Sequence, residues 1–104
     1  MIKHINDNDY KAEVLDNAGV VVVDFFATWC APCKMLAPVL EELQGEMGEI
    51  KIVKIDVDES PITASKYGVQ SIPTIKIFKA GAEVATKMGF MPKEALKEVI
   101  EEVI

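Results

Sequence analysis

The sequence predicts an α/β fold in which helices cover both faces of a mixed β-sheet. Short apolar, β-branched segments alternate along the chain with segments whose apolar residues recur at helical spacing. The segment Val20–Ala27 is apolar on both faces, which is typical of a strand covered on both sides. The order β-α-β-α-β-α-β-β-α and the length of 104 residues predict a single domain spanning residues 1–104.

The strands are expected at Ile2–Ile5, Val20–Ala27, Lys51–Val57, Thr74–Lys79 and Glu83–Met88. The last two form an antiparallel hairpin because the turn between them is short. A first helix is capped by Asn6 or Asp7 and runs to about Asn17, where Gly19 ends it. A third helix has Ser60 as its cap and Pro61 in its first turn, and it closes at Gly68.

The second helix follows the two cysteines and contains a proline. Its apolar stripe consists of Leu36, Val39, Leu40, Leu43 and Met47. Pro38 inside that stripe should cost about 3 kcal/mol, but the stripe continues past it, so we predict one bent helix. The last helix begins at Pro92, and its buried face should hold Leu96, Val99, Ile100, Val103 and Ile104.

Composition and charge exclude several classes of function. The net charge is −6 and the chain has no Arg, so an acidic surface would repel phosphate backbones and nucleic acid is not an expected partner. The charged segment Met1–Leu15 does not read as a signal peptide, and the longest apolar run, Ala18–Val23, is too short for a bilayer. We therefore expect a monomer in the cytoplasm, without membrane contact.

Cys30 and Cys33 lie where a buried strand ends and a helix begins. Such a junction presents unpaired N–H groups and the positive end of the helix dipole, which would stabilise a thiolate at Cys30. We expect Cys30 to be exposed and Cys33 to point inward. Helical geometry puts Cα atoms three residues apart at about 5 Å, a distance that a disulfide accepts. The pair should therefore open and close without moving the fold.

Two other uses of the cysteine pair were weighed. A purely structural disulfide closing so short a loop would contribute only about 2 kcal/mol. Zinc or an iron–sulfur cluster needs four ligands, and only the two cysteines and the distant His4 are available. No metal and no cofactor are expected, with a metal shared between two chains as the remaining alternative.

Asp24 interrupts an otherwise apolar strand and shares a face with Val22 and Phe26. Burial without a partner raises a carboxyl pKa by desolvation, which would make Asp24 a proton acceptor and donor suited to neutral pH. The alternative is a solvated carboxylate at a frayed strand end. Lys54, on the strand Lys51–Val57, is a candidate for its charged neighbour.

Two further segments are ambiguous on their own. The Ile72–Pro73 bond precedes a strand, and since only about 5–6% of X-Pro bonds are cis, the residues alone predict trans. Met88-Gly89-Phe90 reads as a strand end followed by a turn.

Taken together, the chain resembles the thioredoxin family over essentially its whole length. The matching residues are Val23-Asp24-Phe25, Ala27, Trp29-Cys30, Pro32-Cys33-Lys34, Pro38, Lys54, Tyr67-Gly68-Val69, Ile72-Pro73-Thr74, Gly81 and Gly89. A lone C-x-x-C is a weak signal, whereas this set in order and at this spacing is specific. The chain departs from the family pattern at Phe26, at Ala31, where Gly is usual, and at Ser71, and none of these changes touches the chemistry.

The resemblance implies a thioredoxin fold with five strands in a mixed sheet flanked by four helices. It implies reduction of protein disulfides, in which Cys30 attacks and Cys33 resolves the mixed disulfide, Asp24 exchanges protons with Cys33, and Lys54 tunes the pair. Pro73 would be cis. The substrate would dock on an apolar surface made of Trp29, Ala31, Pro32, Ile72, Pro73, Gly89 and Phe90, and a thioredoxin reductase would recycle the dithiol.

Two alternative functions remain at this point. A glutaredoxin-like activity would want an aromatic residue between the cysteines and an anion site for glutathione, and neither is visible. A non-catalytic binding subunit could use the same fold as a scaffold, but the retention of Cys30, Cys33 and Asp24 argues against that role.

Overall fold

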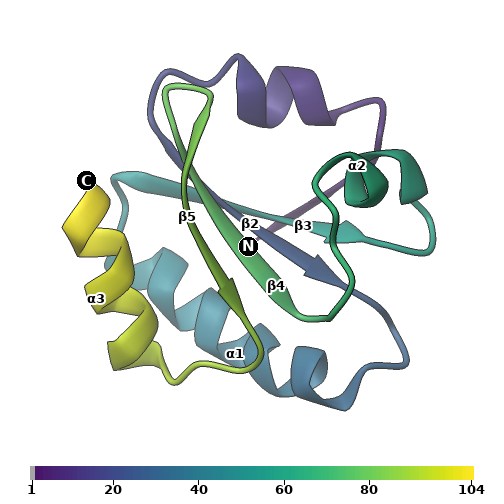
Figure 1. Cartoon of the computed structure of the whole chain (residues 1–104). Coiled ribbons are helices and arrows are strands. Elements are labelled where there is room, and N and C mark those ends of the chain that lie inside the picture. Colours follow the sequence, from purple (N-terminus) through teal and green to yellow (C-terminus); the bar gives the residue numbers. More distant parts are fainter. Residues whose placement is uncertain (1) are drawn as a thin grey trace.

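A computed structural model describes residues 2–104 and confirms the predicted α/β architecture. Figure 1 shows the elements in chain order. The strands are β1 (Lys3–Ile5), β2 (Val20–Phe26), β3 (Ile50–Asp56), β4 (Thr74–Lys79) and β5 (Ala82–Met88). The helices are η1 (Lys11–Leu15), α1 (Ala31–Glu46), α2 (Pro61–Lys66) and α3 (Lys93–Val103). Each strand end lies within one residue of the predicted one.

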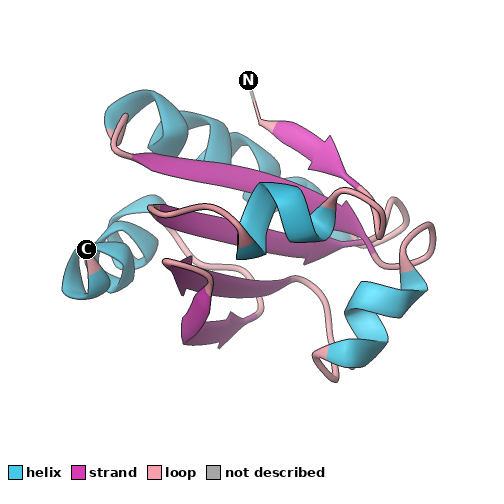
Figure 2. Ribbon diagram, turned by 90° about the horizontal axis from the view of Figure 1, so that it is seen from above, coloured by secondary structure: helices cyan, strands magenta, loops and turns pink. Residues whose placement is uncertain are grey.

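The five strands form one mixed sheet in the order β1-β3-β2-β4-β5. Strands β1, β3 and β2 run parallel, whereas β4 is antiparallel to β2 and β5 is antiparallel to β4. Figure 2 shows β1 and β5 at opposite edges of this sheet. Strand β2 is central, and all seven of its residues are buried, as its apolar sequence predicts.

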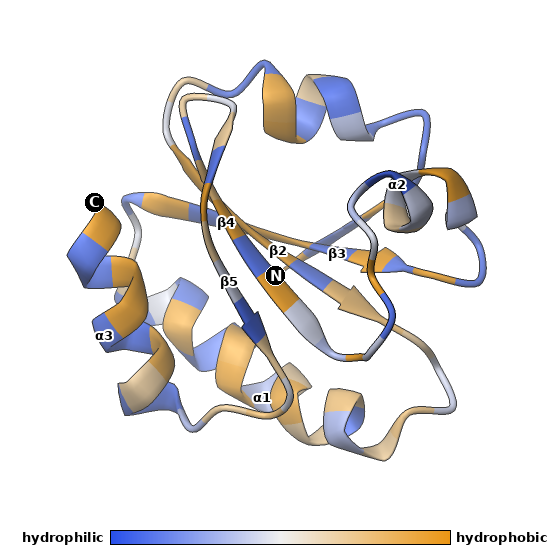
Figure 3. Ribbon diagram, in the orientation of Figure 1, coloured by the Kyte–Doolittle hydropathy of each residue, from blue (hydrophilic) through white to orange (hydrophobic). Residues whose placement is uncertain are grey.

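Each face of the sheet is covered by two helices. On one face, Val22, Ile52, Ile75 and Ile77 of the strands pack with Leu36, Leu40 and Leu43 of α1 and with Leu96 and Ile100 of α3. On the other face, Val21, Val23, Phe25, Val53, Ile55 and Phe78 pack with Val14 of η1 and Ala64 of α2. Figure 3 shows the alternation of polar and apolar residues along α3 that this one-sided burial requires.

The first helix is shorter than predicted and of a different type. It is a π-helix of five residues, Lys11–Leu15, instead of an α-helix running to Asn17. The Asn6 side-chain oxygen accepts hydrogen bonds from the backbone N–H groups of Asn8 and Asp9. Asn6 therefore stabilises a turn rather than a helix start, a competing use that Asn side chains commonly have.

Helix α2 has the predicted N-cap residue, but its capping bonds come from elsewhere in the chain. Ser60 occupies the N-cap position but its side chain makes no capping bond. The Asp7 carboxylate accepts from the backbone N–H groups of Ile62 and Thr63, at 3.2 and 2.8 Å. These bonds satisfy two of the orphan donors at the start of α2 and hold the pKa of Asp7 below its usual value, although burial opposes that shift. A residue far away in the sequence thus replaces the local cap.

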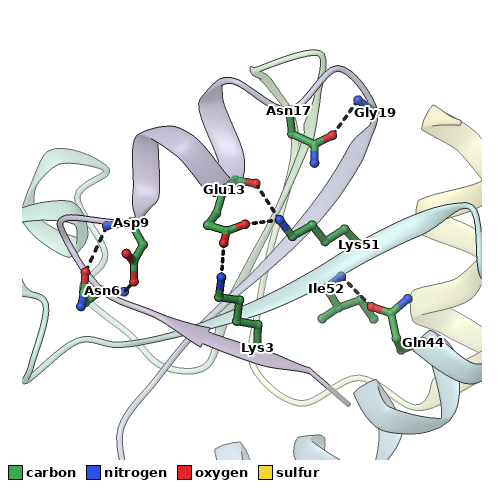
Figure 4. Close-up of polar contacts among 9 residues, drawn as sticks. All are labelled: Lys3, Asn6, Asp9, Glu13, Asn17, Gly19, Gln44, Lys51 and Ile52. Carbon is green, nitrogen blue, oxygen red and sulfur yellow. Dashed lines mark hydrogen bonds and ion pairs between the residues drawn. The ribbon is translucent and has the colours of Figure 1, made fainter.

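Hydrogen bonds from polar side chains connect β3 to η1 and α1 (Figure 4). Glu13 of η1 accepts hydrogen bonds from Lys3 of β1 and Lys51 of β3, and these bonds lower its pKa to about 2. Strand β1 begins opposite Val53, so the start of β3 has no strand neighbour on that side among residues 2–104. The Gln44 side chain of α1 supplies the missing partners, accepting from Ile52 N–H and donating to the Ile50 carbonyl.

Three details of the remaining elements bear on the predictions. Helix α1 continues through Pro38, which is exposed, so the predicted single helix is confirmed. At the β4–β5 turn, Gly81 has φ +82°, and a Cβ there would collide with the Leu15 carbonyl, so only glycine fits. The prediction that Ile104 faces the core is wrong, because α3 ends at Val103 and Ile104 is 50% exposed.

Candidate active site

The two cysteines occupy the first turn of α1, directly after the central strand. Strand β2 ends at Phe26, and Cys30 is the N-cap of α1 with an extended backbone. The backbone N–H of Cys33 donates to Cys30 Sγ at 3.2 Å, and Pro32 lies in the first turn, where a missing N–H is tolerated. The Cys30 sulfur therefore takes the place that a Ser or Asp oxygen takes in an ordinary helix cap. The same N–H groups would stabilise a thiolate.

Cys30 and Cys33 are joined by a disulfide. Their Cα atoms are 5.2 Å apart, which matches the separation predicted from helical geometry. Both cysteines lie within one turn of one helix. Opening or closing the disulfide therefore requires a local change in two side chains and no rearrangement of the fold.

The expected exposure of Cys30 is wrong for this disulfide form. Cys30 is 5% exposed and Cys33 3%. Both sulfur-bearing residues pack with Phe26 and Ala27, and the partly buried Ile72 covers the same cluster. The two cysteines are thus covered by apolar neighbours that sequence spacing alone does not reveal, while Ala31 and Pro32 of the same turn stay exposed.

The Ile72–Pro73 peptide bond is cis. The expectation from the family resemblance is confirmed, and the trans geometry inferred from the residues alone is wrong. The Ile72 carbonyl oxygen lies 3.8 Å from Cys30 Sγ. Pro73 is buried, and its carbonyl accepts a hydrogen bond of 2.8 Å from Gly89 N–H. The segments before β4 and after β5 therefore meet beside the disulfide.

The other residues expected to form a docking surface differ in their exposure. Trp29 is 69% exposed, Phe90 is 41% exposed, and Ala31 and Pro32 are also exposed. Ile72 and Gly89 are half-buried, and Pro73 is the exception because it is buried. In a surface built from this set, Pro73 itself would thus present little area to a substrate.

Asp58 is a neighbour that the sequence reading missed. The indole N–H of Trp29 donates to Asp58 Oδ2 at 2.8 Å. Asp58 follows the carboxyl end of β3, and Trp29 follows the carboxyl end of the parallel β2. Because the carboxyl ends of parallel strands meet at one edge of the sheet, the predicted topology could have indicated this contact.

Asp24 is fully buried, as predicted. It lies between Val22, which packs beneath α1, and Phe26, which packs against the two cysteines, and alternation puts these three side chains on one face of β2. Neither carboxyl oxygen has a hydrogen-bond partner among residues 2–104. Burial raises the pKa of the Asp24 carboxyl to about 7, so it can take up or release a proton near neutral pH.

Lys54 is the residue opposite Asp24 in the β2–β3 register. Its positive charge opposes the rise in the pKa of Asp24, but burial has the larger effect. The Lys54 ammonium lies 4.7 Å from the centre of the Phe26 ring. The structure thus brings Lys54 into the surroundings of Asp24 and of the ring that packs on the cysteines.

Metal and membrane sites find no support among residues 2–104. No group of three or more His, Cys, Asp or Glu side chains in this range could hold a metal ion. None of the helices there has the length and apolar character needed to cross a bilayer.

Comparisons with known proteins agree with this geometry. The thioredoxin family model matches residues 1–102. The chain is 59% identical over 95 residues to a thioredoxin of Bacillus subtilis, covering 90% of this chain and 89% of that one. It is 52% identical over 105 residues to a thioredoxin of Listeria monocytogenes, with both chains covered completely. A thioredoxin of Staphylococcus epidermidis is 52% identical over 101 residues, which is 96% of this chain and 95% of the relative.

These matches span nearly the full chain at more than half identity, and the cysteine pair forms a disulfide in the first turn of α1. This chain therefore belongs to the thioredoxin family of thiol–disulfide oxidoreductases, and it is a protein-disulfide reductase.

Proposed function

We propose that the chain, as a single domain over residues 1–104, reduces protein disulfides with Cys30 as nucleophile and Cys33 as resolving thiol. One observation carries this assignment of roles. Cys30 is the N-cap of α1, where its sulfur already accepts a backbone N–H, whereas Cys33 lies one turn further into the helix. A thiolate at Cys30 therefore gains a hydrogen bond and the helix dipole, and both effects lower its pKa.

The reaction has two exchange steps. The Cys30 thiolate attacks one sulfur of the substrate disulfide, forming a mixed disulfide and releasing one substrate thiolate. The Cys33 thiolate then attacks Cys30 Sγ, which breaks the mixed disulfide and releases the second substrate thiolate. Two electrons pass from the cysteine pair to the substrate, and the pair ends as the Cys30–Cys33 disulfide.

Cys33 must lose a proton before it attacks, and Asp24 is the group proposed to accept it. Its pKa of about 7 means that it can hold or release a proton at physiological pH. Its place on β2, between Val22 and the Phe26 that packs on both cysteines, supports this role. Lys54 would tune the exchange by favouring the charged form of Asp24.

The docking surface for the substrate is proposed to consist of Trp29, Ala31, Pro32, Ile72, Pro73, Gly89 and Phe90. Its exposed aromatic residues are Trp29, which precedes Cys30, and Phe90, which follows the Gly89 bonded to Pro73. Both would bury apolar area on contact. Ile72 has its carbonyl beside Cys30, and its backbone would bind an extended substrate segment. Pro73 is buried and its carbonyl is bonded to Gly89, so it would contribute by fixing the position of the Ile72 backbone.

The cellular setting is part of the same proposal. A thioredoxin reductase would return the disulfide to the dithiol, and a reducing compartment, the cytoplasm, would keep the reaction running toward reduction. The chain would act as a monomer, because the docking surface has to stay open to different protein substrates.

An insulin-reduction assay coupled to NADPH and a thioredoxin reductase tests this function. Insulin disulfides should be reduced catalytically, and NADPH consumption should stop when Cys30 is replaced by Ser. Reduction that depends on glutathione and not on the reductase would instead assign a glutaredoxin-like activity. Binding of protein partners without any turnover would assign a non-catalytic role.

A further inference from the structure

Met88 is a highly exposed thioether at the edge of the proposed docking surface. It is the last residue of β5 and is 70% exposed, whereas Met47 in the core is 3% exposed. Gly89, its neighbour in the chain, donates to the Pro73 carbonyl, so the end of β5 is fixed beside the cis-proline segment. Figure 1 shows the end of β5 and the start of β4 at the same end of the hairpin.

The Met88 sulfur also contacts the residue that precedes Ile72. The Ser71 hydroxyl donates to Met88 Sδ at 3.4 Å. Thr74, which is paired with Met88 in the β4–β5 register, donates its hydroxyl to the Ser71 carbonyl at 2.5 Å. Ser71 is thus held from both sides, and it is joined directly to the Ile72 whose carbonyl lies against Cys30. A change in the chemistry of Met88 reaches the docking surface through a single residue.

The same side chain borders a cavity with a mixed polar and apolar lining. This cavity of about 260 Å³ lies between the Tyr67–Ser71 segment and strands β4 and β5, and Met88, Thr86 and Lys76 line it. The Lys76 ammonium and the Thr86 hydroxyl in this cavity already donate to other groups. The donor that faces Met88 is the Ser71 hydroxyl. A thioether is a weak acceptor, whereas a sulfoxide oxygen is a strong one.

We propose that Met88 is a site of reversible oxidation by peroxides, and that its sulfoxide weakens the docking of protein substrates. The thioether sulfur attacks one peroxide oxygen, the S–O bond forms, and the O–O bond breaks. The departing hydroxide takes the remaining peroxide proton and leaves as water. The sulfur loses two electrons and the peroxide gains them. A methionine sulfoxide reductase reverses the step with two electrons from a dithiol, releasing water.

The effect on docking follows from polarity and from the Ser71 contact. A sulfoxide at the rim of an apolar surface must lose bound water when a substrate covers it, which opposes binding. The Ser71 hydroxyl would donate to this oxygen instead of to the sulfur. Ser71 would then shift, and the adjoining Ile72 would shift with it. The disulfide chemistry at Cys30 and Cys33 is untouched. The KM for a protein disulfide should therefore rise while the rate with a small aromatic disulfide stays the same.

The test starts from the disulfide form, in which both cysteines are protected from peroxide. The protein is treated with graded hydrogen peroxide, freed of it, reduced, and assayed with insulin and with dithiobis(nitrobenzoate). Tandem mass spectrometry separates oxygen on Met88 from oxygen on Met91. Met88 should gain one oxygen at lower peroxide than Met91 or Met47, and the insulin KM should rise about five- to tenfold. A methionine sulfoxide reductase should restore the KM.

Two variants separate Met88 from Met35, the exposed methionine of α1. Peroxide should leave the insulin KM of Met88→Leu unchanged and raise that of Met35→Leu as in the wild type. The reverse pattern, or a KM that does not follow the oxygen on Met88, would overturn the proposal. The inference rests on the proposed function, but different results would refute the two. An untreated protein that does not reduce insulin refutes the proposed function. The position of the added oxygen, determined by mass spectrometry, tests the role of Met88 alone.

Discussion

Asp24 and Lys54 lie opposite each other on β2 and β3 without a direct hydrogen bond. The Asp24 carboxyl is fully buried, while the Lys54 ammonium lies over the Phe26 ring at 4.7 Å from its centre. The lysine thus acts on the carboxyl through its charge rather than through a shared proton. Burial prevails over this charge and sets the pKa of Asp24 at about 7. Asp24 is therefore a proton acceptor with a pKa near neutrality and does not form a hydrogen-bonded ion pair with Lys54.

Replacing Lys54 by Met should raise the pKa of Asp24 further. The positive charge that favours the carboxylate disappears, while the burial that favours the neutral acid stays. The carbon-13 shift of the Asp24 carboxyl, followed by NMR titration, reports this pKa directly. The matched control is Lys51→Met on the same strand, since Lys51 pairs with Glu13 and should leave the Asp24 titration unchanged. A pKa of Asp24 that does not move in Lys54→Met contradicts the coupling.

The two cysteines should respond differently to replacement by Ser. Cys30→Ser should abolish turnover, because the attacking sulfur is lost. Cys33→Ser should accumulate mixed disulfides with protein substrates, because nothing resolves them. Gel mobility without a reducing agent and mass spectrometry would identify the trapped adducts. If a thiol reagent modified Cys33 before Cys30 in the reduced protein, the two roles would have to be exchanged.

Lys76 and Glu83 form an ion pair whose partners differ sharply in burial. The Lys76 side chain is 8% exposed and donates to Glu83 Oε2 and to Thr86 Oγ1, at 3.0 and 3.1 Å. Glu83→Gln should destabilise the protein by about 1–3 kcal/mol, because it leaves a buried cation without its counter-charge. Lys76→Met should cost less or stabilise, since it removes the buried charge itself. Urea melts of both variants decide this, and an equal loss in both would contradict it.

Chelators should not affect the stability of this chain. The described residues bring together no cluster of metal-ligating side chains, and both cysteines are engaged in a disulfide. Thermal melts with and without EDTA should therefore superimpose. A lower Tm in EDTA that zinc restores would assign the cysteines to a metal and remove the basis of the redox function.

The sequence predicted well those features that depend on apolar pattern and spacing. The run Val20–Ala27 predicted the buried central strand, and the interval between Cys30 and Cys33 predicted a separation that a disulfide accepts. The apolar residues on both sides of Asp24 in the strand favoured its burial. In each case the property depends on neighbours in the chain, which the sequence displays directly.

Features that depend on contacts across the fold were not predictable in this way. Asp7 supplies capping bonds to a helix that begins more than fifty residues later, and so Ser60 holds the predicted N-cap position without making the capping bond. The burial of Cys30 depends on Ile72, which comes from another strand connection. Lys76 reads as an ordinary strand lysine until β5 brings Glu83 and Thr86 beside it. No periodicity within one segment encodes such partners.

Asp24→Asn should make the protein more stable, and the gain should depend on pH. The folded pKa of about 7 lies above the value of 3.8 that applies to an unperturbed Asp. Through linkage, the folded state then binds more protons than the unfolded state between these two values. Stability from this group is fully present below about pH 4 and is lost as the pH rises through about 7. The difference corresponds to about 4 kcal/mol as an upper bound.

The advantage of the Asn variant should therefore grow from about pH 4 to about pH 7 and then level off. An amide also lacks a hydrogen-bond partner at this position, which adds a cost that is the same at every pH and leaves the slope unchanged. Urea melts of both proteins across this range measure the slope, with Glu59→Gln as a control for an exposed carboxylate. Insulin reduction by Asp24→Asn should fall over the same range, because Cys33 loses its proton acceptor. A stability difference that stays constant with pH would mean that the Asp24 carboxyl keeps its ordinary pKa, and its proposed part in proton exchange would then lose its physical basis.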